Sequence, residues 1–358
     1  MKNKLPIFGL LCCVLFSQCN RKDPEIVYPK EKEGWKMLPD SLITFDARNI
    51  RTSATDGPYL MFFAHNSNYV FDSSFAEPGS YRYSFNMPAY INDKLNYKAG
   101  PRFRIFNDQQ NTDIIIAANR RAVSNSRTFF SAMADAGVQG KVSDFSAPDE
   151  QDNFYAAITT DMMGGTKSYI LYKYHLVQEE SGAVRKELLW HTTLLSGLTG
   201  PEDGVSGVNA VGNTAFVTTS GMTYLVEDGR VKDSTVVALR NMVKYQQYYV
   251  ANCSWRATRG QEYPVGLVFS SDQGHSWQYI GTGSSFGTGQ LVSMDNQLYL
   301  NNGSTLSLVD LVNKDLRPLV RSTDVNGYIR TLNLFRNKVY IGTDAGVYTK
   351  SLEAFRQQ

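Results

Sequence analysis

The segment Phe269-Ser270-Ser271-Asp272-Gln273-Gly274-His275-Ser276-Trp277 ends one apolar run of this 358-residue chain and begins another. The same organisation extends from about Pro39 to the end of the chain. Short apolar stretches rich in Tyr, Phe, Val and Thr alternate with turns that contain Asn, Asp and Gly. We find no sustained 3.6-residue periodicity, so the sequence predicts an all-β fold.

The pattern Ser-x-Asp-x-Gly-x-Ser-Trp resembles the Asp-box, or bacterial-neuraminidase repeat, of β-propellers, with Ser276 where that family usually has Thr. The resemblance implies a hairpin turn in which the carboxylate accepts amide hydrogen bonds, the glycine lets the backbone reverse, and the tryptophan packs alongside. The residues that would serve this structural role are Ser270, Asp272, Gly274, Ser276 and Trp277. A match this short informs on architecture rather than chemistry.

A second pattern supports the propeller. A polar turn residue, a spacer and three apolar residues recur along the chain, with copies on average about 45 residues apart, which is the length of one four-stranded blade. With a further blade at 58–63, the pattern predicts seven blades, and six or eight remain alternatives. The clear copies begin at Asn213, Asn296 and Asn337, and the weaker ones at Asn111, Asn153 and Gln246.

The last unit supplies only three strands, at 328–335, 339–343 and 347–352, so its fourth strand must come from elsewhere. We expect Leu42-Ile43-Thr44-Phe45 to provide it and to close the ring, which would remove an exposed sheet edge. No convincing outer strand for the second blade is found between Met133 and Lys141. We expect a single propeller domain over residues 39–358, because a propeller can exceed the usual size of one core.

The beginning of the chain has the features of an export signal. Lys2 and Lys4 precede an apolar run too short for a spanning helix, and a polar segment follows Cys19. Residues 15–19 resemble the lipobox of bacterial lipoproteins, particularly those of the Bacteroidetes, although Gln18 departs from the usual Gly or Ala. We expect a signal peptide over 1–18, lipid on Cys19 and a flexible tether over 19–38; ordinary cleavage is the alternative.

These features predict an exported outer-membrane lipoprotein that faces the periplasm or the cell surface. Residues 22–25 look like a short acidic surface-export tag. Cys253 would then be the single cysteine of the mature domain, and we expect it to be a buried hydrophobic residue rather than part of a disulfide or metal site. We expect no metal and no cofactor. The 36 basic and 34 acidic residues give no basic field to recruit nucleic acid, so we expect no nucleic-acid partner.

Strand parity identifies the expected ligand side. Because successive antiparallel strands reverse direction, the turn between strands two and three lies on the same side as the link to the next blade, and the 270–277 turn lies on the other side. The long loop 254–263 falls on the ligand side, where Trp and Arg side chains suit a sugar or a protein hot spot. Packing of Trp255 beneath its own loop is the alternative. The candidate binding residues are Trp255, Arg256, Arg259, Arg120, Arg121 and Arg104, the last expected at the start of an innermost strand.

Phe103-Arg104-Ile105-Phe106 matches three of four positions of the sialidase Phe-Arg-Ile-Pro motif, which makes a sialidase-like exo-glycosidase the alternative function. The chain lacks repeated Asp-boxes, and its 21 tyrosines allow no nucleophile to be singled out. The metalloprotease motif His-Glu-x-x-His does not occur among the four histidines. We therefore predict a noncatalytic, lipid-anchored propeller that recognises a protein or a glycan.

Overall fold

A computed structural model describes residues 34–39, 49–56, 59–64, 68–72, 96–100, 103–107, 113–117, 122–126, 141–161, 167–180, 184–198, 204–219, 222–235, 237–254, 265–283, 286 and 289–358. The chain divides into two units, 1–31 and 32–358, and all of the described residues belong to the second. The expected signal peptide, Cys19 and most of the expected tether lie outside the described residues.

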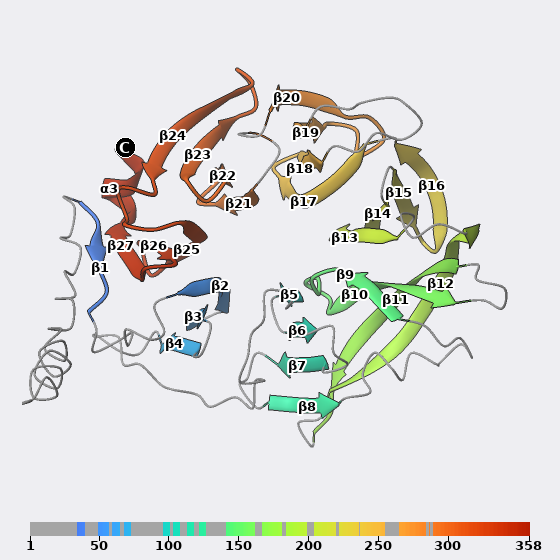
Figure 1. Cartoon of the computed structure of the whole chain (residues 1–358). Helices are drawn as coiled ribbons and strands as arrows, with labels where there is room; N and C mark the ends of the chain where they lie inside the picture. The colour runs from blue at the N-terminus through green and yellow to red at the C-terminus, as the bar shows by residue number, and fades with distance from the viewer. Residues whose placement is uncertain are drawn as a thin grey trace, which may run out of the picture. The chain divides into compact units, whose positions relative to one another are not determined.

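The described strands form seven antiparallel sheets, six of four strands and one of three (Figure 1). The first three sheets contain β2 (Ile50–Asp56), β3 (Tyr59–Ala64) and β4 (Asn68–Asp72); β5 (Asn96–Ala99), β6 (Phe103–Asn107), β7 (Asp113–Ala117) and β8 (Ala122–Ser126); and β9 (Lys141–Phe145), β10 (Asn153–Asp161), β11 (Lys167–Gln178) and β12 (Val184–Leu198).

The next three sheets follow the same order along the chain. They contain β13 (Val205–Val211), β14 (Thr214–Thr219), β15 (Thr223–Glu227) and β16 (Arg230–Thr235); β17 (Ala238–Tyr245), β18 (Tyr248–Ser254), β19 (Gly266–Ser270) and β20 (Gln278–Thr282); and β21 (Gln290–Met294), β22 (Gln297–Asn301), β23 (Thr305–Asp310) and β24 (Asp315–Arg321).

The last sheet combines β25 (Ile329–Phe335), β26 (Lys338–Thr343) and β27 (Val347–Ser351) with β1 (Lys36–Met37), which pairs with β27. A short helix, α3 (Leu352–Arg356), follows. Trp35 is buried edge-on against Phe355 of this helix, with the ring centroids 6.1 Å apart. The fourth strand thus comes from within the segment expected to be a tether, while the expected donor, 42–45, lies outside the described residues.

Burial explains why the second strand gave the clearest sequence signal in most of the sheets. All six residues of β14 are buried, whereas β16, the fourth strand of the same sheet, is mostly exposed. The repeated Asn has a separate cause. Asn296 and Asn337 each follow a residue with positive φ and have positive φ themselves, as the two-residue turns that match strand twist require. Asn tolerates this conformation better than most residues.

Apolar clusters join neighbouring sheets and form the core. The β9–β12 sheet, for example, packs Phe154 and Ile158 against Phe103 and Ile105 of the β5–β8 sheet. Comparable clusters connect each of the later sheets to the next, and the β25–β27 sheet to the β2–β4 sheet. The first strands β9, β13, β17, β21, β25 and β2 contact one another in that order.

The second sheet corrects the position of one repeat. The copy predicted at Asn111 corresponds to β7, the third strand of its sheet, and the second strand is β6. The outer strand sought between Met133 and Lys141 is β8, at 122–126. Second and third strands are both short apolar runs after a turn, so the pattern did not distinguish them. Arg104 consequently lies on a second strand, paired with Ala99 and Ile116, and not at the start of an innermost strand.

Several first strands contain a β-bulge where they begin. The register shifts between Ile50 and Thr52, between Val205 and Gly207, and between Ile329 and Thr331. In all three strands the residue before the extra one pairs with the last residue of the second strand. These residues are Ile50, Val205 and Ile329. A bulge re-aims the extra side chain and is frequent beside functional sites. The extra residues are Arg51, Ser206 and Arg330.

Candidate functional site

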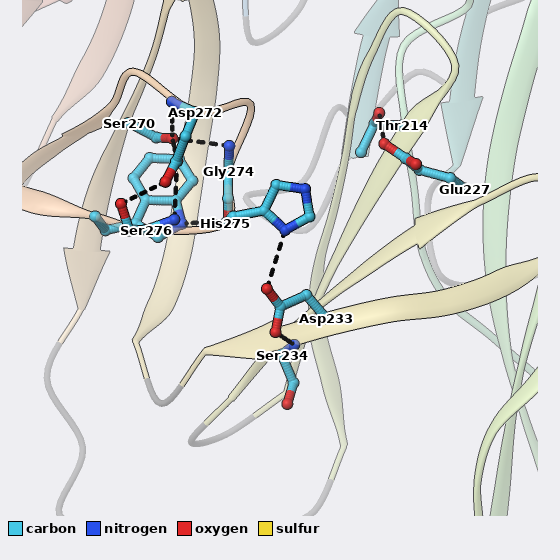
Figure 2. A network of polar contacts seen from close by, with 10 residues as sticks. Thr214, Glu227, Asp233, Ser234, Ser270, Asp272, Gly274, His275 and Ser276 are labelled. Carbon is cyan, nitrogen blue, oxygen red and sulfur yellow. Dashed lines mark hydrogen bonds and ion pairs between the residues drawn. The ribbon is translucent and has the colours of Figure 1, made fainter.

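The turn between β19 and β20 is held by its own side chains (Figure 2). The hydroxyl of Ser270 donates to Oδ1 of Asp272 at 2.7 Å and accepts the backbone N–H of Gly274 at 2.7 Å. The Asp272 carboxylate accepts the backbone N–H of Ser276 at 2.9 Å and its hydroxyl at 2.6 Å. These bonds lower the pKa of Asp272 to about 2, led by those from Ser276.

Gly274 and Trp277 fix the turn against the neighbouring sheet. Gly274 has φ +97°, and a Cβ atom there would lie 2.4 Å from Cε1 of Phe216. The indole Nε1 of Trp277 donates to the carbonyl oxygen of Gly274 at 3.0 Å, and its ring meets Phe216 edge-on at 6.3 Å. Phe216 belongs to β14, so the turn packs on the preceding sheet.

An exposed polar contact adds to this packing. Nδ1 of His275 lies 3.0 Å from Oδ2 of Asp233 on β16. The hydrogen bond to His275 is the main cause of a lowered pKa at Asp233. Both side chains are about half exposed, so solvent screens the pair. The 270–277 turn therefore connects two sheets, and its polar groups are already engaged with one another.

The strand register shows at which end of the sheet the 270–277 turn lies relative to the beginning of the first strand, β17. Ser270 pairs with Tyr249 near the start of β18, whereas Ala238, the first residue of β17, pairs with Ser254 at the end of β18. The turn and the beginning of β17 are thus at opposite ends of the sheet. Ser254, the last described residue before 255–264, lies at the same end of the sheet as the beginning of β17.

Trp255, Arg256, Arg259, Arg120 and Arg121 lie outside the described residues, and Arg104 is described only as part of the β6 backbone. Cys253 is buried, and burial is the main cause of its raised pKa.

Sequence reasoning missed the basic residues of the first strands. The tripeptide Ile-Arg-Thr occurs at 50–52 and again at 329–331, at the beginnings of β2 and β25. The related Leu-Arg-Asn occurs at 239–241 in β17. The repeated tripeptide was visible in the sequence. Only the strand register shows that its two copies occupy equivalent positions in their sheets.

Arg330 lies against the aromatic ring of Tyr328. Its guanidinium carbon lies 4.6 Å from the centre of the Tyr328 ring. Its Nε atom is buried and has no hydrogen-bond partner. The hydroxyl of Tyr328 donates to the carbonyl oxygen of Asn302 at 3.0 Å, and its backbone N–H donates to Oδ1 of Asp344 at 2.8 Å. Tyr328 is 45% exposed. The pair presents a fixed aromatic ring and a cation at the surface.

Within the part of the chain that the structure describes, no three His, Cys, Asp or Glu side chains are grouped as a metal site would require. No helix among the described residues is long and apolar enough to cross a membrane.

Comparison with known proteins identifies the architecture. The sequence matches no known protein family and no curated protein. Solved structures do resemble the fold. The Pan2 WD40 domain of Neurospora crassa has a TM-score of 0.51 and 10% identity, with 90% of this chain and 97% of that chain covered.

Two further structures agree. The extracellular domain of the putative hybrid two-component system BT4673 from B. thetaiotaomicron has a TM-score of 0.52 and 9% identity, with 89% of this chain and 40% of that chain covered. YCF48 bound to D1 peptide has a TM-score of 0.50 and 11% identity, with 90% and 98% covered. At such low identity the likeness shows the fold alone, and that fold is a β-propeller.

Proposed function

We propose that the chain is a noncatalytic binding module, a β-propeller held at the bacterial outer membrane by lipid on Cys19, which recognises a protein or a glycan. A propeller likeness favours a binding or scaffold role, but it does not by itself assign a ligand. In this proposal the 270–277 turn is an Asp-box that stabilises the scaffold, and binding takes place at the ends of the sheets where the first strands begin.

The observation that carries the proposal is the contrast between these two places. The polar groups of the 270–277 turn bond to one another, so little is left to bind a ligand. The Tyr328–Arg330 pair offers an exposed ring and a buried donor without a partner. Among the solved structures, YCF48 is described with a bound peptide, which supports a peptide or protein ligand as a suitable class.

Membrane fractionation tests the anchor. Lipid supplies most of the membrane affinity of such a protein, so Cys19→Ser should move the chain to the soluble fraction with an unchanged melting temperature. Membrane retention of Cys19→Ser would contradict lipidation.

A glycan array, run with a sialidase assay on the same full-length protein, tests the binding role. Saturable binding without turnover is the expected result. Release of sialic acid that is lost on substitution of an arginine would favour the sialidase-like alternative.

A further inference from the structure

The beginnings of β2 and β25 share one local design. Ile50 and Ile329 each pair with the last residue of the second strand of their sheet, and the arginine that follows is the extra residue of a bulge. A bulge takes its extra residue out of the regular ladder and turns its side chain in a new direction. Arg51 and Arg330 thus occupy equivalent positions in two sheets.

These two sheets are neighbours. Strand β2 contacts β25 directly, and Nδ2 of Asn333 donates a hydrogen bond to Oγ of Ser53. A Cβ atom at Gly342 would lie 2.8 Å from Cγ2 of Ile50, which shows how closely the β25–β27 sheet approaches the beginning of β2. The two arginines therefore come from adjacent first strands.

Arg330 lacks the partner that a buried guanidinium N–H normally has. Its Nε is buried without an acceptor, and no ion pair joins it to an acidic side chain among the described residues. The carboxylate of Asp344 is engaged elsewhere, since its Oδ1 accepts the backbone N–H of Tyr328. Buried polar groups in native proteins usually have a partner in the protein, in ordered water or in a ligand, and among the described protein groups Nε of Arg330 has none.

Tyr328 holds the guanidinium in place and also limits what can bind. Its hydroxyl donates to the carbonyl oxygen of Asn302, and the backbone of Gly303 lies so close that a Cβ atom there would be 1.7 Å from Cζ of the ring. Arg330 covers the ring as well. Gly303 and Arg330 thus both contact the ring, which is 45% exposed, and the group of this pair without a partner is Nε of Arg330.

We propose that Arg330, together with Arg51 at the equivalent position of the adjacent first strand, binds a carboxylate presented by an acidic segment of a partner protein. Carboxylates match the planar fork of an arginine and form charge-assisted hydrogen bonds with it. This inference rests on the proposed binding function and specifies its ligand class. A chain carrying several carboxylates also suits a surface with arginines on more than one first strand, including the exposed Arg240 of β17.

Fluorescence anisotropy with a labelled peptide of alternating Gly and Glu would test the site on the full-length protein. Arg330→Gln should weaken binding about tenfold or more, as expected when a bond between charged groups is lost, and Arg51→Gln should weaken it in the same direction. Arg317→Gln, which removes an exposed arginine from the fourth strand β24, is the matched control and should bind as the wild type does. A peptide with Gln in place of Glu should not bind.

Each contrary result has a distinct meaning. Equal binding by wild type and Arg330→Gln, or binding of the Gln peptide, would overturn the carboxylate site. Binding of oligogalacturonate that depends on Arg330, without binding of the Glu peptide, would overturn the protein partner in favour of an acidic glycan. If Arg330→Gln lowers the melting temperature, Arg330→Lys replaces it, because it keeps the charge but loses the fork and should still weaken binding.

Failure of this site would leave the wider proposal open to its own tests. If neither acidic probe binds, the carboxylate site is wrong, while glycan-array binding and the release of Cys19→Ser from membranes still decide the anchored binding function.

Discussion

Asp272 binds Ser276 twice, accepting its backbone N–H at 2.9 Å and its hydroxyl at 2.6 Å, and this pair closes the turn between β19 and β20. Removal of the carboxylate leaves an amide and two hydroxyls without their acceptor. Asp272→Ala should lower the free energy of unfolding by about 1–3 kcal/mol. Denaturant titration measures this, with Glu180→Ala, an exposed carboxylate, as the control. Equal stability of the two variants would show that the turn does not depend on Asp272.

The same carboxylate should make stability depend on pH. Its folded-state pKa of about 2 lies below the ordinary value of 3.8, so its contribution is present above about pH 4 and is lost as the pH falls toward 2. The stability difference between wild type and Asp272→Ala should therefore be smaller at about pH 2 than at about pH 6. Solvent exposure limits this change to about 1 kcal/mol. A difference that grows on acidification would contradict the assignment.

Gly274 should be intolerant of any side chain for two separable reasons. Its φ of +97° strains other residues, and a Cβ atom would meet Phe216 at 2.4 Å. Gly283 has φ +108° with open space around it, so Gly283→Ala measures the strain alone. Gly274→Ala should cost about 1–3 kcal/mol more than Gly283→Ala in denaturant titration, because the core must shift to admit the methyl group. Equal losses of unfolding free energy in the two variants would show that the Phe216 ring moves aside without a measurable loss of stability.

Asn301 should link two sheets. Its Nδ2 donates to the carbonyl oxygen of Ile329 on β25 at 3.2 Å, and its Oδ1 accepts the backbone N–H of Gly303 at 3.0 Å. The side chain is buried, so Asn301→Ala should cost about 1–3 kcal/mol. Gln278→Ala, an exposed amide on β20, should be neutral in the same thermal melts. A neutral Asn301→Ala would mean that water replaces both bonds.

The second strands of most sheets were predictable because they are apolar on both faces and follow a turn residue. The second sheet was misaligned because its first strand, Asn-Tyr-Lys-Ala at 96–99, is short and largely polar, so nothing marked it as a strand. The pairing of Lys36–Met37 with β27 was equally hidden, since a two-residue strand carries no periodicity. Blade number and ring closure remain predictions.

The candidate site was less accessible to sequence reasoning than the scaffold. The length of the loop 254–263 led to the prediction that Trp255 and Arg256 bind a ligand, and both residues lie outside the described residues. Arg51 and Arg330 sit inside strands, where a polar residue is ordinarily taken to face solvent. Their significance depends on bulges in the register, and a bulge changes side-chain direction without leaving a composition signal.

The most direct test of the account is a comparison of Arg330→Gln with Asp272→Ala, measured for both thermal stability and binding of the acidic peptide. We expect Arg330→Gln to keep its melting temperature and lose binding, because its guanidinium serves a ligand. We expect Asp272→Ala to have a lower melting temperature and, in its folded fraction, to bind the acidic peptide as the wild type does. The reverse pattern, in which Asp272→Ala loses binding and Arg330→Gln loses only stability, would contradict the division between scaffold and binding surface.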